Sequence, residues 1–175
     1  MSHISIKKLA ATALLLGAIT VHATDLEDRY RQAGHPATSA SMFKSLSLDT
    51  DAAIRKRVAS NRRTPKNILL RLANDPEQSV KIAVATNLSA ADETFLILAK
   101  DSMQAVRSVV ARFEYVPVAA LHILANDKDV DVRLEVARNL NSTKEILFKL
   151  SHDPNHSVST LAEQALQRLD DEKHQ

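Results

Sequence analysis

The chain has 175 residues, no cysteine, only two glycines and a formal net charge of +2. The lack of cysteine excludes disulfide bonds, cysteine-ligated metals and thiol catalysis. Glycine-rich loops that bind nucleotide phosphates need several glycines for close backbone approach, so nucleotide binding of that type is excluded as well.

Residues 1–23 are predicted to be a secretory signal peptide. Lys7 and Lys8 form a basic start, Leu9–Val21 is mostly apolar, and Val21–Ala23 fits a cleavage site. The apolar stretch is shorter than the about 20 residues of a membrane span, so we expect no integral membrane segment after signal removal. The mature chain would keep 21 basic and 21 acidic residues. We therefore expect a periplasmic or secreted protein without net charge.

Residues 24–48 are predicted to form an N-terminal cap and half of a repeat. Leu26–Ala33 is expected to be helical and to end at Gly34. The half repeat shows the period of the following units, because Thr38, Phe43 and Leu46 precede Thr64, Leu69 and Leu72 by 26 residues. A terminal unit of a repeat protein is expected to be atypical, since one of its faces has no neighbour.

A period of 26 residues divides residues 49–152 into four predicted units. Each unit opens with an aspartate, and a fifth aspartate continues the series: Asp49, Asp75, Asp101, Asp127 and Asp153. A cation follows six residues later in the four units: Arg55, Lys81, Arg107 and Arg133. Two stretches per unit have apolar residues at helical spacing. The sequence therefore predicts an all-α fold, an α-solenoid of short two-helix repeats.

The recurring polar residues have a structural interpretation. Asp75 is expected to cap the following helix, and the cation is expected to reach a neighbouring carboxylate or carbonyl. Thr64 and Ser142 are expected to open second helices. Three asparagines are expected to tie off the first helices: Asn61, Asn87 and Asn139. The alternative is a charged binding stripe. We favour the structural interpretation because the positions follow the repeat, as packing requires.

Residues 153–175 are predicted to be a C-terminal capping repeat with a charged tail. The pattern changes after Val158, and the helix is expected to continue through Leu161–Leu169. The tail, Asp170–Gln175, would keep the last face in water. No linker of low complexity interrupts residues 49–169, so we expect one domain.

Three segments resemble the variant leucine-rich repeat, a bacterial relative of HEAT-like repeats. They read IRKRVASNRRTPKNILLRLANDP, VKIAVATNLSAADETFLILAKDS and VRLEVARNLNSTKEILFKLSHDP, and they share a V-R-x-x-V-A-x-N core, a T-P helix start and an L-x-x-L-A-x-D ending. The resemblance covers about residues 49–158 and implies a right-handed superhelix used mainly for interaction. Some relatives carry a cysteine-ligated iron–sulfur module, which this chain cannot hold. Phe113 stands where the family pattern has asparagine.

The first unit is unusually basic. Arg55–Arg71 contains seven basic residues and no acidic residue, whereas Asp127–Glu135 is mainly acidic. Such a block could steer an acidic partner, a phosphate-rich surface or nucleic acid, or it could be an ordinary solvated face. The candidate contact residues in this block are Arg62, Arg63 and Lys66.

Four further residues complete the candidate contact set. Phe113 and Tyr115 lie in the predicted connection of the third unit, where other units carry polar or small residues. They could form an interface or fill a gap between units. Leu96 and His122 belong to an in-phase row on the second helices: Leu70, Leu96, His122 and Phe148. This row could line an apolar groove or belong to the core between repeats.

The chain shows no nucleophile motif, no paired carboxylates in a recognisable setting and no metal-ligand helix, so we expect no enzyme, cofactor or metal site.

The favoured function is an exported, non-enzymatic repeat scaffold that binds a protein or peptide partner. The alternative is a HEAT-like solenoid that binds a polyanion or nucleic acid through the basic first repeat. Neutral charge after signal removal and export argue against nucleic acid. An enzyme, or a regulatory subunit of one, is the third class.

Overall fold

The computed structural model describes residues 25–171, which consist of helices and short loops. The predicted signal peptide lies outside the described residues. Residues 25–34 are helical, and ten helices follow in this part of the chain: α2 (Ala40–Leu46), α3 (Ala52–Ser60), α4 (Lys66–Leu72), α5 (Gln78–Ala85), α6 (Asp92–Leu98), α7 (Gln104–Arg112), α8 (Val118–Leu124), α9 (Val130–Arg138), α10 (Lys144–Leu150) and α11 (His156–Asp171). The starts of α3, α5, α7, α9 and α11 repeat at 26 residues, and so do those of α2, α4, α6, α8 and α10.

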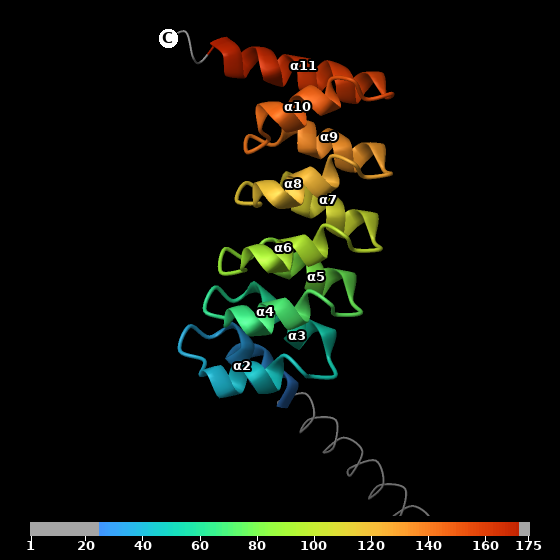
Figure 1. The fold of residues 1–175 in the computed structure, drawn as a ribbon. Helices are drawn as coiled ribbons and strands as arrows, with labels where there is room; N and C mark the ends of the chain where they lie inside the picture. The colour runs from blue at the N-terminus through green and yellow to red at the C-terminus, as the bar shows by residue number, and fades with distance from the viewer. Residues whose placement is uncertain (1–24, 172–175) are drawn as a thin grey trace, which may run out of the picture.

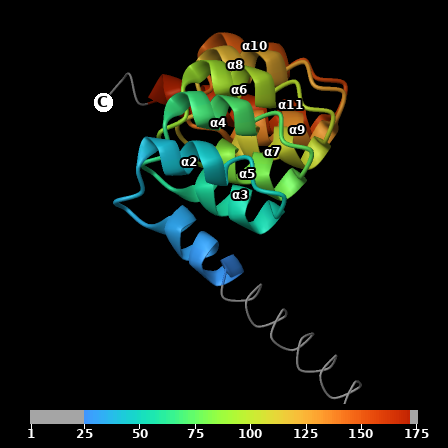
Figure 2. The same ribbon diagram turned by 90° about the horizontal axis from the view of Figure 1, so that it is seen from below.

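The helices form two layers of an elongated stack (Figure 1). Viewed along the stack, α4, α6, α8 and α10 lie in one layer over α3, α5, α7 and α9 in the other (Figure 2). Each first helix contacts the first helix of the next unit, from α3 through α11, and the two helices of each unit also contact each other. The protein is therefore an all-α solenoid of two-helix repeats.

The core repeats with the same period as the helices. Each complete first helix buries two aliphatic residues and an alanine, as in Ile54, Val58 and Ala59 of α3. The second helices add larger side chains, such as Leu69 and Phe95. Isolated helices this short are unstable in water, so the helices depend on burial against neighbouring units. None of the helices in residues 25–171 combines the length and hydrophobicity that a bilayer crossing requires.

The last helix closes the stack at its C-terminal end. As predicted, α11 continues well past the length of the other first helices. It contacts both α9 and α10. Ala165 is buried, and Leu161, Leu166 and Leu169 pack against the core. One long helix thus covers the surface that a further helix pair would cover in the interior of the stack.

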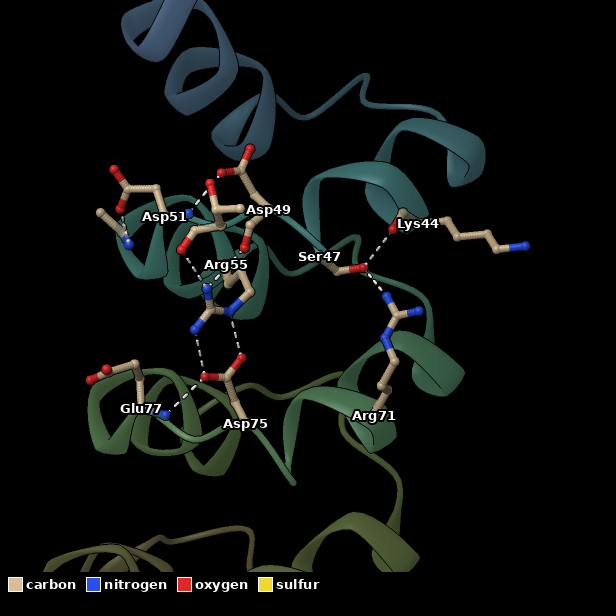
Figure 3. Close-up of polar contacts among 10 residues, drawn as sticks. Lys44, Ser47, Asp49, Asp51, Arg55, Arg71, Asp75 and Glu77 are labelled. Carbon is tan, nitrogen blue, oxygen red and sulfur yellow. Dashed lines mark hydrogen bonds and ion pairs between the residues drawn. The ribbon is translucent and has the colours of Figure 1, made fainter.

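A ladder of ion pairs joins each unit to the next. Its five members connect residues 20 positions apart: Arg29–Asp49, Arg55–Asp75, Lys81–Asp101, Arg107–Asp127 and Arg133–Asp153. Arg55 donates from Nε and Nη2 to the two carboxylate oxygens of Asp75 at 2.7 and 2.9 Å (Figure 3). Its Nη1 donates to the backbone carbonyl of Asp49 at 2.8 Å. One guanidinium therefore holds its own unit and the following unit together.

The aspartates act differently from the prediction. Asp75 accepts a hydrogen bond from the backbone N–H of Glu77 at 2.9 Å, and Glu77, not Asp75, is the N-cap residue of α5. The prediction that these aspartates cap the following helices is therefore wrong, because their carboxylates shape the loop and bind the cation of the preceding unit. The prediction that the cation reaches a neighbouring carboxylate or carbonyl is confirmed, and in Arg55 it reaches both.

Two members of the ladder, Arg29–Asp49 and Lys81–Asp101, differ from the others. Arg29 lies one period before Arg55, so the ladder begins in the helical segment 25–34, ahead of the series recognised in the sequence. Lys81 replaces arginine in the third member and binds Asp101 through its ammonium group, with an Nζ–Oδ2 distance of 2.6 Å. An ammonium cannot form the bidentate contact of a guanidinium. The ladder therefore links the units 75–100 and 101–126 through fewer hydrogen bonds than it forms at the Arg55, Arg107 and Arg133 positions.

Three of the ladder carboxylates, those of Asp75, Asp127 and Asp153, are held in their ionised form. Burial favours the neutral form of Asp75 and Asp127, but hydrogen bonds from Arg55 and Arg107 and from backbone N–H groups outweigh it, so the pKa of each carboxyl lies below its ordinary value. The hydrogen bond from Arg133 is the main reason that the pKa of Asp153 is lowered. The paired geometry therefore stabilises the fold only while the carboxylates are charged.

Replacing one buried cation, Arg107, should test the ladder. The side chains of Arg107 and Asp127 are each only 6% exposed. We expect Arg107→Met to lower the free energy of unfolding by about 3 kcal/mol, because it leaves a buried carboxylate without its partner. Urea denaturation measures the change. Arg112→Met is the matched control, since Arg112 is exposed and lies outside the ladder; equal losses for the two variants would contradict the role of the ladder.

Acid should remove the contribution of the same pairs. A carboxyl whose folded-state pKa is lowered stabilises the fold above its unfolded pKa of about 4 and loses this contribution as the pH falls through the folded value. We expect the stability difference between the wild type and Asp127→Asn to be largest at neutral pH and to shrink below about pH 4. Urea denaturation at a series of pH values measures it. A difference that is constant from pH 7 to pH 3 would argue against this assignment.

Candidate interaction surface

The loops inside the units form one continuous edge of the stack, which we call the loop edge. It consists of residues 61–65, 86–91, 113–117 and 139–143, each of which connects the two helices of one unit. In Figure 1 these loops follow one another on the left, opposite the loops that carry the ladder aspartates. The loop edge crosses all four predicted central units.

Asparagine side chains build this edge by linking neighbouring loops. The Nδ2 atom of the buried Asn87 donates to the carbonyls of Ala59 and Asn61 at 2.6 and 3.0 Å. Asn61 and Asn139 form the same pair of bonds one period earlier and two periods later. The asparagines tie off the first helices, as predicted: Asn61 and Asn139 are the C-cap residues of α3 and α9. Their side chains in addition reach carbonyls at the end of the first helix of the preceding unit. They therefore set the spacing of the loops.

Buried hydroxyl groups complete the inner side of the loop edge. Thr64 Oγ1 donates to the carbonyl of Val58, and Ser142 Oγ donates to that of Val136, each at 2.6 Å. The N-cap residue of α4 is Pro65 and that of α10 is Thr143. The prediction that Thr64 and Ser142 open the second helices is therefore wrong, because both hydroxyls satisfy carbonyls at the end of the first helix.

Phe113 interrupts the asparagine series and forms an aromatic cluster. Its ring stacks on Phe95 of α6 with a centroid distance of 5.6 Å, and Tyr115 contacts it edge-on at 5.8 Å. Phe95 is buried, Phe113 is half-buried and Tyr115 is 63% exposed. The cluster therefore joins two units in place of an amide hydrogen bond. Phe113 fills the gap between units, whereas Tyr115 presents its ring to solvent.

Two leucines that the sequence analysis did not select lie on the same edge. Leu88 is 49% exposed and Leu140 is 82% exposed. With Tyr115 they place an exposed apolar side chain on each of three successive loops. The signal was present in the sequence, because both leucines directly follow a structural asparagine at a position where a loop residue is expected to be polar. A single exposed apolar residue is common on protein surfaces. That three of them lie exposed on three successive loops became visible only in the structure.

The basic pair Arg62 and Arg63 lies at the start of this edge. Both residues are exposed, and within residues 25–171 neither forms an ion pair with a carboxylate; the same holds for Lys66 at the start of α4. Other cations of the basic block are engaged elsewhere: Arg55 belongs to the ladder, Arg57 lies over the ring of Tyr30, and Arg71 donates to Ser47 (Figure 3).

The remaining predicted contact residues lie on a different surface. Leu96 of α6 is half-buried, and His122 of α8 is exposed. Their row ends in Phe148, which is 64% exposed and contacts the ring of His152 at 4.9 Å. Arg62 and Arg63 thus lie on the same edge as Phe113 and Tyr115, but two loops away from them. Lys66 lies at the start of α4, and Leu96 and His122 lie on the layer of second helices.

A separate groove of about 700 Å³ lies at the N-terminal end of the stack, between residues 25–36 and α3. Leu26, Tyr30 and Arg57 line part of it. The first helical segment ends at Gly34 as predicted, yet no glycine in residues 25–171 has a positive φ. Gly34 instead leaves room for Arg57, since a Cβ atom there would lie 2.2 Å from Arg57 Nε.

Comparisons with protein-family models, curated proteins and solved structures find no match to this chain. In residues 25–171 no group of three or more His, Cys, Asp or Glu side chains is arranged to hold a metal ion. The arrangement of the loop edge is suited to non-covalent binding: it offers exposed apolar side chains on three successive loops and, on the loop before them, two guanidinium groups that have no ion-pair partner among residues 25–171.

The asparagine position offers a test of how the loop edge is built. We expect Phe113→Asn to be more stable than Phe113→Ala by about 1–2 kcal/mol, because asparagine can donate to the carbonyls of residues 85 and 87 as its counterparts do. Thermal or urea denaturation measures both. For comparison, Tyr115→Asn and Tyr115→Ala should differ by less than about 0.5 kcal/mol, since Tyr115 is exposed. Equal stabilities of the two Phe113 variants would contradict the shared geometry.

Proposed function

We propose that the protein is an exported, non-enzymatic repeat scaffold that binds a protein or peptide partner along the loop edge. The observation that carries this proposal is the set of exposed apolar side chains on three successive loops, Leu88, Tyr115 and Leu140, next to a loop whose Arg62 and Arg63 have no ion-pair partner in the described part of the chain. The repeat motifs support assignment to the variant leucine-rich repeat class. The predicted signal peptide at residues 1–23 supports export to the periplasm or the exterior.

The physical argument concerns rigidity as well as composition. The loops are short, and side-chain bonds to backbone carbonyls fix loop 86–91 to loop 61–65 and loop 139–143 to loop 113–117. Between the units 75–100 and 101–126 the stacking of Phe113 on Phe95 takes their place. A surface that is already ordered loses little conformational entropy when a partner binds, which favours affinity. Arginine and tyrosine are also the residues most often found at the energetic centres of interfaces. The loop edge combines both residue types with exposed leucines.

Selection from a random twelve-residue peptide library tests this function. We expect the mature wild-type protein to enrich binders that are lost with a variant carrying Arg62→Glu, Arg63→Glu, Leu88→Ser, Tyr115→Ser and Leu140→Ser. All five residues are exposed, so circular dichroism of the variant should show an intact helical fold. The readout is binding of individual selected peptides by fluorescence anisotropy.

The matched control carries substitutions on the opposite edge of the stack. Lys100→Glu with Lys128→Glu changes two exposed cations in loops that connect units and should leave the selected binders unaffected. Failure to enrich any binder that depends on the loop edge would contradict the proposal. Retention on heparin that is lost with Arg62→Glu and Arg63→Glu, without peptide binding, would favour the polyanion alternative.

A further inference from the structure

We propose that the partner segment is an extended peptide in the polyproline II conformation, with acidic residues at one end followed by an apolar residue at every third position. This inference rests on the proposed function and names the chemistry of its partner. It follows from the spacing of the loops and from the order of charged and apolar side chains along the loop edge.

The repeat spacing selects the peptide conformation. Packed helices of neighbouring units are separated by about 8–10 Å, so equivalent points on successive loops repeat at about that distance. A polyproline II helix has three residues per turn and a rise of about 3.1 Å per residue, so side chains on one face recur every ~9.3 Å. A β-strand repeats on one face every ~6.7 Å. The polyproline II conformation therefore matches one residue triplet to each unit.

The apolar positions of the peptide follow from the exposed residues. Leu88 and Leu140 occupy equivalent positions two periods apart, and Tyr115 lies on the loop between them, one residue beyond the equivalent Glu114. Apolar peptide residues six positions apart would meet the two leucines, and the apolar residue midway between them would lie nearest to Tyr115. An exposed aromatic ring suits such a partner, because polyproline II segments bind to aromatic surfaces and, being extended beforehand, lose little entropy. Each of the three loops would thus contact one triplet of peptide residues.

The charges determine which end of the peptide is acidic. Arg62 and Arg63 occupy the loop before Leu88, and both are exposed without a carboxylate partner in the described part of the chain. Glu114 is exposed on the loop of Tyr115 and would repel an acidic residue there. The acidic end therefore lies at the first loop, one triplet before the apolar residue that meets Leu88.

Two synthetic peptides of identical composition test the spacing. The first has the sequence EEPLSPLSPL, in which leucine occupies positions 4, 7 and 10; the second, EEPLSLPLSP, has leucine at positions 4, 6 and 8. Fluorescence anisotropy with the mature protein should show the first peptide binding about tenfold more tightly. A third peptide, KKPLSPLSPL, reverses the charge at the acidic end and should also bind about tenfold more weakly than the first.

Protein variants locate the peptide on the loop edge. Arg62→Glu with Arg63→Glu should abolish the preference for EEPLSPLSPL over KKPLSPLSPL, and Leu140→Ser should weaken binding of EEPLSPLSPL. The control Lys100→Glu with Lys128→Glu should change neither. Added salt should weaken binding of the acidic peptide, because exposed ion pairs are screened.

The outcomes separate this inference from the proposed function. Equal affinity for the first two peptides, or library binders without acidic residues and three-residue periodicity, would overturn the inference while leaving peptide binding intact. Absence of measurable binding to EEPLSPLSPL at millimolar concentration would overturn it as well. Tighter binding of single-stranded DNA or polyphosphate than of the peptide, lost with Arg62→Glu and Arg63→Glu, would assign the basic pair to polyanions instead.

Discussion

The structure depends on one interaction that crosses from each unit to the next: a cation on the first helix binds an aspartate 20 residues later. In three members, those of Arg55, Arg107 and Arg133, the guanidinium joins the carboxylate of the next unit to a carbonyl of its own unit. Helices of this length are too short to be stable alone. A buried ion pair is not by itself strongly stabilising, but it specifies how one unit sits on another. Burial of apolar side chains supplies most of the stability, and the ladder fixes the position of each unit relative to the next.

The opposite edge has its own set of links, and the two sets are modified at the same junction. Between the units 75–100 and 101–126, the ladder uses Lys81 and the asparagine position holds Phe113. Each change replaces a two-bond polar link with a simpler contact. The aromatic cluster that results leaves Tyr115 exposed next to the leucine-bearing loops. Departures from a structural pattern are expected where a surface has another role, and this junction is the clearest departure among the described residues.

The repeat separates the residues that stabilise the fold from the residues that vary on its surface. The buried positions repeat almost without change from α3 to α9, whereas the residue after each structural asparagine, or after Phe113 in its place, differs between units: arginine, leucine, glutamate and leucine. Loops can vary in this way because their exposed side chains contribute little to the core. Their spacing is nevertheless constant, since it is imposed by the helices beneath them. Variable side chains on a fixed spacing are what a binding surface for an extended segment requires.

The sequence by itself determined the helices, their period, the core positions and the long closing helix, because each of these depends on apolar residues within one short segment. It also placed Phe113 and Tyr115 in the connection between two helices. Only the tertiary structure decided that Asp75 binds Arg55 instead of capping α5 and that the side chain of Asn87 reaches the preceding unit. It also decided that Leu88, Tyr115 and Leu140 are exposed on one edge, whereas Leu96 and His122 lie on the layer of second helices. The physical reason is that these partners lie 20 to 28 residues apart, so their contacts depend on how the units stack and not on any local pattern.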